Sequence, residues 1–231
     1  MRTIVLALCL MLPLSIFAQQ PFEGGLFLGF ANYQGDLAEA PIEFGETKLA
    51  FGLLGRYHYD KNIAIKSNIF YGLIEGDDHN AKDNFNRDWR FKADVIEIGM
   101  NIEWKIFYKS RFNKAGIFRK QVYPYGYLGL ALTFADAELE VPEQDQYRFP
   151  EEGDRSTFLA FPVGGGLKFD FSEHFSFGAE GGWRFLGNDF LDGVSRNGNK
   201  VKNDWYMFGG ITLTYFFGDP QPDFGFRYNR K

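Results

Sequence analysis

The sequence predicts an all-β protein, an eight-stranded antiparallel up-and-down transmembrane β-barrel. Three observations predict it. Apolar residues recur with period two in segments of about ten residues, which is typical of strands with two contrasting faces. The connections between these segments alternate between long and short. Aromatic residues make up 19% of the chain, and 27 Gly accompany 27 Phe. A membrane barrel combines these features because every second strand residue faces lipid and the others are polar or small.

The first residues have the features of a secretory signal peptide. Arg2 supplies a positive charge, the segment 4–14 is apolar, and cleavage is expected after Ala18. Cys9 follows Leu8, where a lipoprotein signal has a small residue, so lipidation is not expected. The sequence therefore predicts a signal peptide over 1–18, a barrel over 19–217 and a periplasmic tail over 218–231.

Eight segments carry the alternation, each with large apolar side chains on one face and polar or small ones on the other. In chain order they are 25–32, 48–59, 63–75, 93–107, 122–134, 157–171, 175–186 and 205–217. Their apolar faces are represented, in the same order, by Leu28, Phe51, Ile69, Ile98, Leu130, Val163, Phe177 and Leu213. The fourth segment is the clearest, since Ile96, Ile98 and Ile102 alternate with Glu97 and Glu103.

The connections support the same architecture. Tight hairpins are expected at 60–62 and 172–174, whereas 33–47, 76–92, 135–156 and 187–204 are long and polar. Long extracellular loops and short periplasmic turns are typical of outer-membrane barrels. An even number of strands then places both ends of the barrel in the periplasm of a Gram-negative bacterium. The connection 108–121 departs from this pattern because it should be short, yet it is long and basic.

A soluble ligand-binding barrel is the alternative, with its apolar face inward. The apolar face here is too bulky for the narrow lumen of a small barrel, so we expect it to face lipid. The opposite face then places a polar network in the lumen, made of Lys66, Glu97, Glu103, Lys168, Asp170, Glu180 and Arg184. These charges could line a conduit or a proton path. Mutual neutralisation is the favoured interpretation, because buried charges must pair.

Composition and motifs exclude several functions. The formal net charge of −5 argues against a nucleic-acid partner. His58, His79 and His174 have no serine placed to form a catalytic triad, so no enzyme activity is expected. The acidic loops that contain Asp77 and Glu143 could hold a divalent cation, but no spacing matches a calcium loop. We expect a solvated surface there, with no metal site and no cofactor.

Basic residues gather at the expected periplasmic end. They are Lys109, Arg111, Lys114, Arg119 and Lys120 in the fourth connection, and Arg227, Arg230 and Lys231 in the tail. One interpretation is a docking surface for a periplasmic protein. The other is a disordered tail whose basic residues lie near anionic lipid headgroups.

Several motifs in order resemble one known family. They include Gly25-Leu26-Phe27-Leu28-Gly29, Tyr33-Gln34-Gly35-Asp36-Leu37, Phe161-Pro162-Val163-Gly164-Gly165-Gly166 and Thr212-Leu213-Thr214-Tyr215. The chain is similar to the PorG-like outer-membrane proteins of Bacteroidota. That resemblance implies a structural role in the type IX secretion system, in which the barrel ties a periplasmic ring lipoprotein and its partner to the outer membrane. The alternative function is a small pore or an adhesin-like surface-binding barrel.

Overall fold

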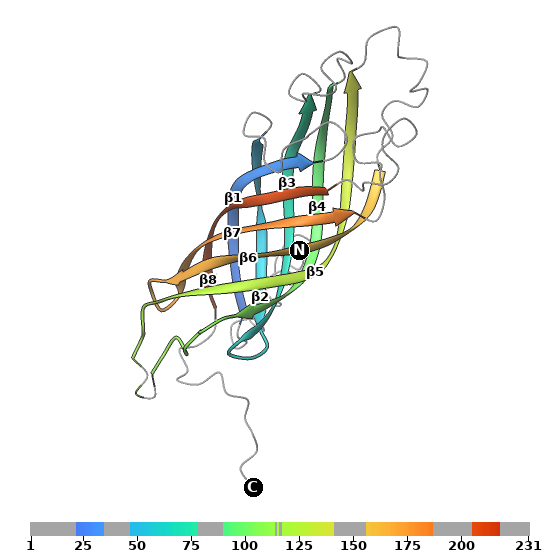
Figure 1. Ribbon diagram of the computed structural model, residues 1–231. Coiled ribbons are helices and arrows are strands. Elements are labelled where there is room, and N and C mark those ends of the chain that lie inside the picture. The colour runs from blue at the N-terminus through green and yellow to red at the C-terminus, as the bar shows by residue number, and fades with distance from the viewer. Residues whose placement is uncertain are drawn as a thin grey trace, which may run out of the picture.

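The computed structural model describes residues 22–34, 47–77, 90–113, 115, 117–140, 156–186 and 205–217. These residues form eight strands. They are β1 (Phe22–Gln34), β2 (Lys48–His58), β3 (Ile63–Asp77), β4 (Arg90–Lys105), β5 (Gln121–Glu140), β6 (Ser156–Asp170), β7 (Phe175–Leu186) and β8 (Trp205–Phe216). Each strand pairs antiparallel with its sequence neighbours, and β1 pairs with β8 to close the barrel (Figure 1). The predicted fold class is confirmed.

The strand bounds differ from the prediction mainly at β1 and β5. β1 starts at Phe22 rather than Gly25, and β5 continues to Glu140 rather than ending at 134. The backbone of β5 pairs with β4 as far as Arg90 opposite Glu140. The acidic residues after Ala135 had indicated a polar loop, but pairing with β4 extends the strand through the first of them.

The two faces of the barrel differ in the way that the alternation predicts. Large apolar side chains such as Met100 and Trp104 point outward, and Trp104 is 65% exposed. Charged side chains such as Glu97 and Lys66 are buried in the lumen, together with small side chains and the rings of Phe27, Phe70 and Phe208. The alternative of a soluble barrel with an apolar lumen is therefore wrong. Separately, the described ranges contain no helix that is long and apolar enough to cross a membrane.

The barrel has two distinct ends. We call one the turn end: it holds the β2–β3 turn at 59–62, the β6–β7 turn at 171–174 and the connection 106–120 between β4 and β5 (Figure 1). The opposite end, the loop end, leads into 35–46, 78–89, 141–155 and 187–204. Those segments lie outside the described residues, as do the expected signal peptide at 1–18 and the expected tail at 218–231.

The connection 106–120 is folded rather than a simple turn. Phe112 and Phe118 form an isolated antiparallel bridge, and their rings meet edge to face with centroids 6.0 Å apart. The amide of Asn113 donates to the carbonyl oxygen of Ile117 at 3.0 Å, and the amide of Arg119 donates to that of Arg111 at 2.8 Å. A small hairpin thus occupies the place where a short turn was expected.

Candidate functional site

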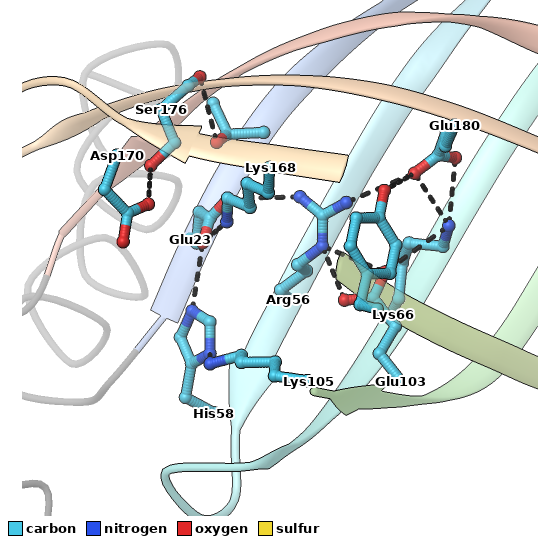
Figure 2. Close-up of polar contacts among 12 residues, drawn as sticks. Glu23, Arg56, His58, Lys66, Glu103, Lys105, Lys168, Asp170, Ser176 and Glu180 are labelled. Atoms are coloured by element: carbon cyan, nitrogen blue, oxygen red, sulfur yellow. Dashed lines mark hydrogen bonds and ion pairs between the residues drawn. The ribbon is translucent and has the colours of Figure 1, made fainter. Parts of the chain in front are cut away.

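Arg56 lies at the centre of a charged cluster inside the turn end of the barrel (Figure 2). Its position on β2 directs it into the lumen, where it is 1% exposed. Its Nε donates to both oxygens of Glu103 at 3.0 and 2.8 Å. Its Nη1 donates to Glu23 at 3.1 Å and its Nη2 to Glu180 at 3.3 Å. One guanidinium therefore joins carboxylates from β1, β4 and β7.

Lys66 is a second cation of this cluster. Its Nζ donates to the two oxygens of Glu180 at 3.0 and 3.2 Å and lies 3.4 Å from Glu103. It also lies 4.0 Å from the centre of the Tyr127 ring. The hydroxyl of Tyr125 donates to Glu180 at 2.6 Å. These contacts supply the pairing that buried charges require.

Glu23 links the cluster to a neighbouring chain of contacts. Lys168 Nζ donates to both of its oxygens. Glu23 Oε2 lies 3.0 Å from His58 Nε2, and His58 Nδ1 lies 2.8 Å from Lys105 Nζ (Figure 2). The series from Glu23 to Lys105 therefore runs from the charged cluster toward the connection 106–120.

Arg111 connects the folded hairpin to the inside of the barrel. Its Nη2 donates to Asp170 at 2.7 Å and its Nη1 to the carbonyl oxygen of Glu173 at 3.0 Å. The hydroxyl of Ser176 donates to Asp170 at 2.7 Å. Burial alone would lower the pKa of Arg111, but the carboxylate of Asp170 raises that pKa above its ordinary value. Arg111 is therefore a cation that fastens the hairpin to β6 and the β6–β7 turn.

Replacing Arg111 by methionine is expected to loosen the hairpin. Charge-assisted hydrogen bonds contribute about 1.5–3 kcal/mol each, so amide hydrogen exchange over 111–119 should accelerate by roughly tenfold or more. Hydrogen-exchange mass spectrometry of the detergent-solubilised protein measures this. Lys120→Met removes an exposed charge from the same connection and should leave the exchange unchanged. Equal exchange in Arg111→Met and the wild type would contradict the anchoring role.

A second cluster lies farther from the turn end, around Glu97 on β4. Arg184 Nε donates to Glu97 at 3.0 Å, and the hydroxyl of Tyr206 donates to it at 2.8 Å. Asn68 donates to the other carboxylate oxygen at 2.9 Å. Thr133 shares a 2.7 Å hydrogen bond with Tyr206. The carboxylate of Glu97 is thus surrounded by donors from β3, β7 and β8.

An aromatic layer fills the lumen beside Glu97. Phe27 and Phe70 stack with ring centroids 4.4 Å apart, and Phe208 meets Phe70 edge to face at 5.7 Å. All three rings are buried. Along β3, Lys66, Phe70 and Ile74 follow one another from the turn end toward the loop end. These three lumen-facing residues of β3 therefore change from charged to aromatic to aliphatic along this direction.

The structure places all seven residues of the predicted lumen network inside the barrel. Lys66, Glu103 and Glu180 meet around Arg56, whereas Glu97 and Arg184 form the second cluster. Lys168 and Asp170 lie at the turn end, where Lys168 pairs with Glu23 and Asp170 pairs with Arg111. The two clusters are not one continuous network of side-chain contacts among the residues described.

The prediction missed several members of the clusters. Glu23 fell before the expected start of the first strand, although extending the alternation from Gly25 by one period places it on the lumen face. Arg56, His58 and Lys105 share the lumen-facing parity of their strands, but the alternation alone gives no reason to group them. Arg111 carries no strand periodicity, so no sequence signal directs it into the barrel.

The expected docking residues behave differently from one another. Lys109, Arg119 and Lys120 are exposed at the turn end. Arg111 is 4% exposed, so its place on an exposed docking surface is a wrong prediction: Asp170 draws its guanidinium inward. Lys114, Arg227, Arg230 and Lys231 lie outside the described residues, and their role remains a prediction.

The histidines and the acidic loop residues also lie partly inside and partly outside the described residues. His58 is held between Glu23 and Lys105, and His174 stacks on the ring of Tyr215 with centroids 5.4 Å apart. His79 lies outside the described residues, as does most of the acidic loop sequence. Within the described ranges, no group of three His, Cys, Asp or Glu side chains is arranged to hold a metal ion.

A comparison with known protein families shows which family this chain belongs to. The family described as "Domain of unknown function (DUF6089)" matches residues 1–225. The chain belongs to this family. No curated protein matches the sequence.

Several solved structures of other proteins are similar in fold to this DUF6089 member. Neisserial surface protein A is similar with a TM-score of 0.50 and 13% identity, covering 84% of this chain and 96% of that one. A major outer membrane protein from Thermus thermophilus has a TM-score of 0.47 and 10% identity, covering 84% and 99%. Ail of Yersinia pestis, in complex with the heparin analogue sucrose octasulfate, has a TM-score of 0.44 and 11% identity, covering 86% and 98%. At these identities the comparison with the Neisserial protein establishes the barrel fold alone.

Proposed function

We propose that this protein is an outer-membrane β-barrel of a Gram-negative bacterium, with its turn end in the periplasm. The apolar outer surface supports contact with membrane lipid, since exposed Leu, Ile and Phe side chains cover the strands. The orientation rests on the short β2–β3 and β6–β7 turns, which are typical of the periplasmic side. The signal peptide expected at 1–18 would direct the chain to this location.

Within that location, we propose a structural role in protein secretion. The barrel would act as the outer-membrane component of the type IX secretion system and tie a periplasmic ring lipoprotein and its partner to the membrane. The observation that carries the proposal is the folded hairpin at 106–120, which is anchored from inside by Arg111. A turn that only joined two strands would need neither the hairpin nor the anchor.

The exposed surface of the hairpin supports a binding role. Phe107 is 89% exposed and has a φ of 55°, a left-handed backbone conformation that is uncommon outside glycine and costs free energy. Ile117 is also exposed, and the same connection carries three exposed basic residues, Lys109, Arg119 and Lys120. Apolar anchors within a polar rim are typical of protein interfaces.

The test is co-purification from detergent-solubilised membranes of the native bacterium. The tagged wild-type chain should retain the periplasmic ring proteins. A variant with Lys109, Arg119 and Lys120 all replaced by glutamate should lose them while still folding. Lys92→Glu reverses an exposed charge near the loop end and serves as the matched control. Absence of the ring proteins from the wild-type preparation would overturn the secretion role. Their retention by the triple variant would overturn the role of the hairpin.

The pore alternative is disfavoured by the filled lumen. We expect the purified protein to show no sustained ionic conductance in planar bilayers, because the aromatic layer of Phe27, Phe70 and Phe208 occupies the lumen beside paired charges. A stable conductance that Arg184→Gln alters would contradict this prediction. The adhesin alternative depends on loops outside the described residues and gains no support here.

A further inference from the structure

A cavity of about 280 Å³ lies at the turn end of the barrel. Its deep part is lined by Glu23, His58 and Lys105, which are buried, and its outer part reaches Lys61, which is exposed. The cavity therefore extends from the charged interior to the surface. Its remaining lining includes the aromatic rings of Tyr108, Tyr123 and Phe216. Burial raises the pKa of the Tyr108 hydroxyl, so this hydroxyl stays protonated and uncharged.

Lys105 is the unusual member of this lining. It is 5% exposed, and among the described residues no carboxylate lies within ion-pair distance of its ammonium group. Its contacts are His58 Nδ1 at 2.8 Å and the ring of Tyr108, whose centre lies 4.5 Å away. An ammonium group has three hydrogens to donate, so its bond to His58 leaves it with unused donor capacity.

His58 cannot neutralise Lys105. Because an ammonium group only donates, Nδ1 of His58 must accept, and the ring hydrogen must then be on Nε2. That hydrogen points to Glu23 Oε2, 3.0 Å away. His58 is therefore a neutral ring, and Figure 2 shows it between Glu23 and Lys105. It orients Lys105 without supplying a negative charge.

The buried charges of the barrel are unequal in number. The described residues bury six cations, Arg56, Lys66, Lys105, Arg111, Lys168 and Arg184, and five carboxylates, Glu23, Glu97, Glu103, Asp170 and Glu180. Every one of these cations except Lys105 contacts a carboxylate directly. When Lys105 is protonated, the excess is one positive charge, and it lies in the wall of the cavity, whose lining also includes Asp60 and Arg111. An unpaired buried charge is costly, so binding one anion there would be favourable.

We propose that this cavity binds a single carboxylate carried by a protein that docks at the turn end, as an acidic side chain or a C-terminus. The carboxylate accepts hydrogen bonds from Lys105 Nζ, and its aliphatic stem lies between Tyr108, Tyr123 and Phe216. One excess positive charge matches a carboxylate better than a doubly charged phosphate. Glu23 does not repel the ligand, because Lys168 and Arg56 already pair with it. The inference rests on the proposed periplasmic docking function and names the chemistry of the partner.

The test uses the detergent-solubilised full chain with lysine side chains labelled with nitrogen-15. The probes are acetate, the peptide acetyl-Gly-Glu-Gly-amide and its neutral counterpart acetyl-Gly-Gln-Gly-amide. We expect the glutamate peptide to shift the Lys105 resonance saturably and acetate to do so at higher concentration. The glutamine peptide should have no effect. An equal shift with the glutamine peptide, or no saturable shift with either acid, would overturn the proposal.

Two variants and a control locate the site. Lys105→Met should weaken peptide binding, measured by calorimetry, by roughly tenfold or more, because a charge-assisted hydrogen bond is lost. Ser110→Phe keeps Lys105 but adds a large ring to the cavity lining, so it should weaken binding similarly. Lys92→Gln removes an exposed charge near the loop end, outside the cavity, and should bind normally. Unchanged binding in both Lys105→Met and Ser110→Phe would overturn the proposed site.

The outcomes of these experiments distinguish this inference from the docking function itself. If acetate binds as tightly as the glutamate peptide, the site takes a free small acid and the protein-borne source is wrong. If the ring proteins co-purify with Lys105→Met as well as with the wild type, the cavity is not where the partner binds, although the secretion role stands. If Lys105→Met loses the ring proteins and Lys92→Gln keeps them, both proposals are supported together.

Discussion

Replacing Arg56 by methionine is expected to destabilise the barrel by about 3–5 kcal/mol, the range found when one partner of a buried ion pair is removed. Arg56 donates four hydrogen bonds to the carboxylates of Glu23, Glu103 and Glu180. Methionine fills part of the volume but donates none of these bonds. Lys66 and Lys168 remain close to the same carboxylates, yet Glu103 keeps only the longer contact of 3.4 Å with Lys66. Urea unfolding of the protein in detergent micelles measures the loss.

The control for this change is Arg119→Met. Arg119 is exposed in the connection 106–120, so its loss should alter stability by no more than about 0.5 kcal/mol. Adding Glu103→Gln to Arg56→Met should recover part of the loss, since the two residues share their hydrogen bonds and their effects are not additive. Unfolding of Arg56→Met within the error of the wild type would mean that Arg56 does not hold the carboxylates together.

The faces of the strands were predictable because a strand has a side-chain period of two. Once Ile96 and Ile98 are assigned outward, Glu97 must point into the lumen. The same alternation predicts that Lys66, Glu180 and Arg184 also point into the lumen. Strand ends were less predictable, because β5 is extended by pairing with β4 rather than by its own pattern. Glu23 was missed for the corresponding reason at the start of β1.

The site at the turn end depends on contacts that no local pattern contains. Arg111 belongs to a connection without periodicity, and its inward direction is decided by Asp170 on β6, far along the chain. Lys105 has the same strand parity as Glu103 and so belongs to the lumen face, but the absence of a carboxylate beside it is evident only when the surrounding described strands are in place. The sequence therefore predicts which residues face the lumen, whereas the pairing of those residues is a property of the closed barrel.

Closure of the barrel is expected to fail or weaken severely when Gly29 is replaced by alanine. Gly29 on β1 lies opposite Gly210 on β8, at the seam that joins the first and last strands. A Cβ atom at Gly29 would lie 2.1 Å from the carbonyl oxygen of Gly209 and 2.6 Å from Cα of Gly210. Both are backbone atoms, so no side-chain rotation relieves the clash. Forcing extra volume into packed structure costs about 1–3 kcal/mol, occasionally more, and we expect about 3 kcal/mol or more here.

Gly126→Ala is the matched control for this prediction. Gly126 also lies in a strand opposite another glycine, Gly165, but the nearest atom to its added Cβ is the carbonyl oxygen of Gly164, 3.8 Å away. Alanine there meets ordinary contacts and restricts the unfolded chain, so stability should stay the same or rise by about 0.4–1 kcal/mol. The folded fraction after dilution from urea into detergent, followed by circular dichroism, compares the two variants. Equal folding of both would mean that the seam between β1 and β8 can open to admit a methyl group. Selective failure of Gly29→Ala would locate the steric requirement for closure at the pair of glycines where β1 meets β8.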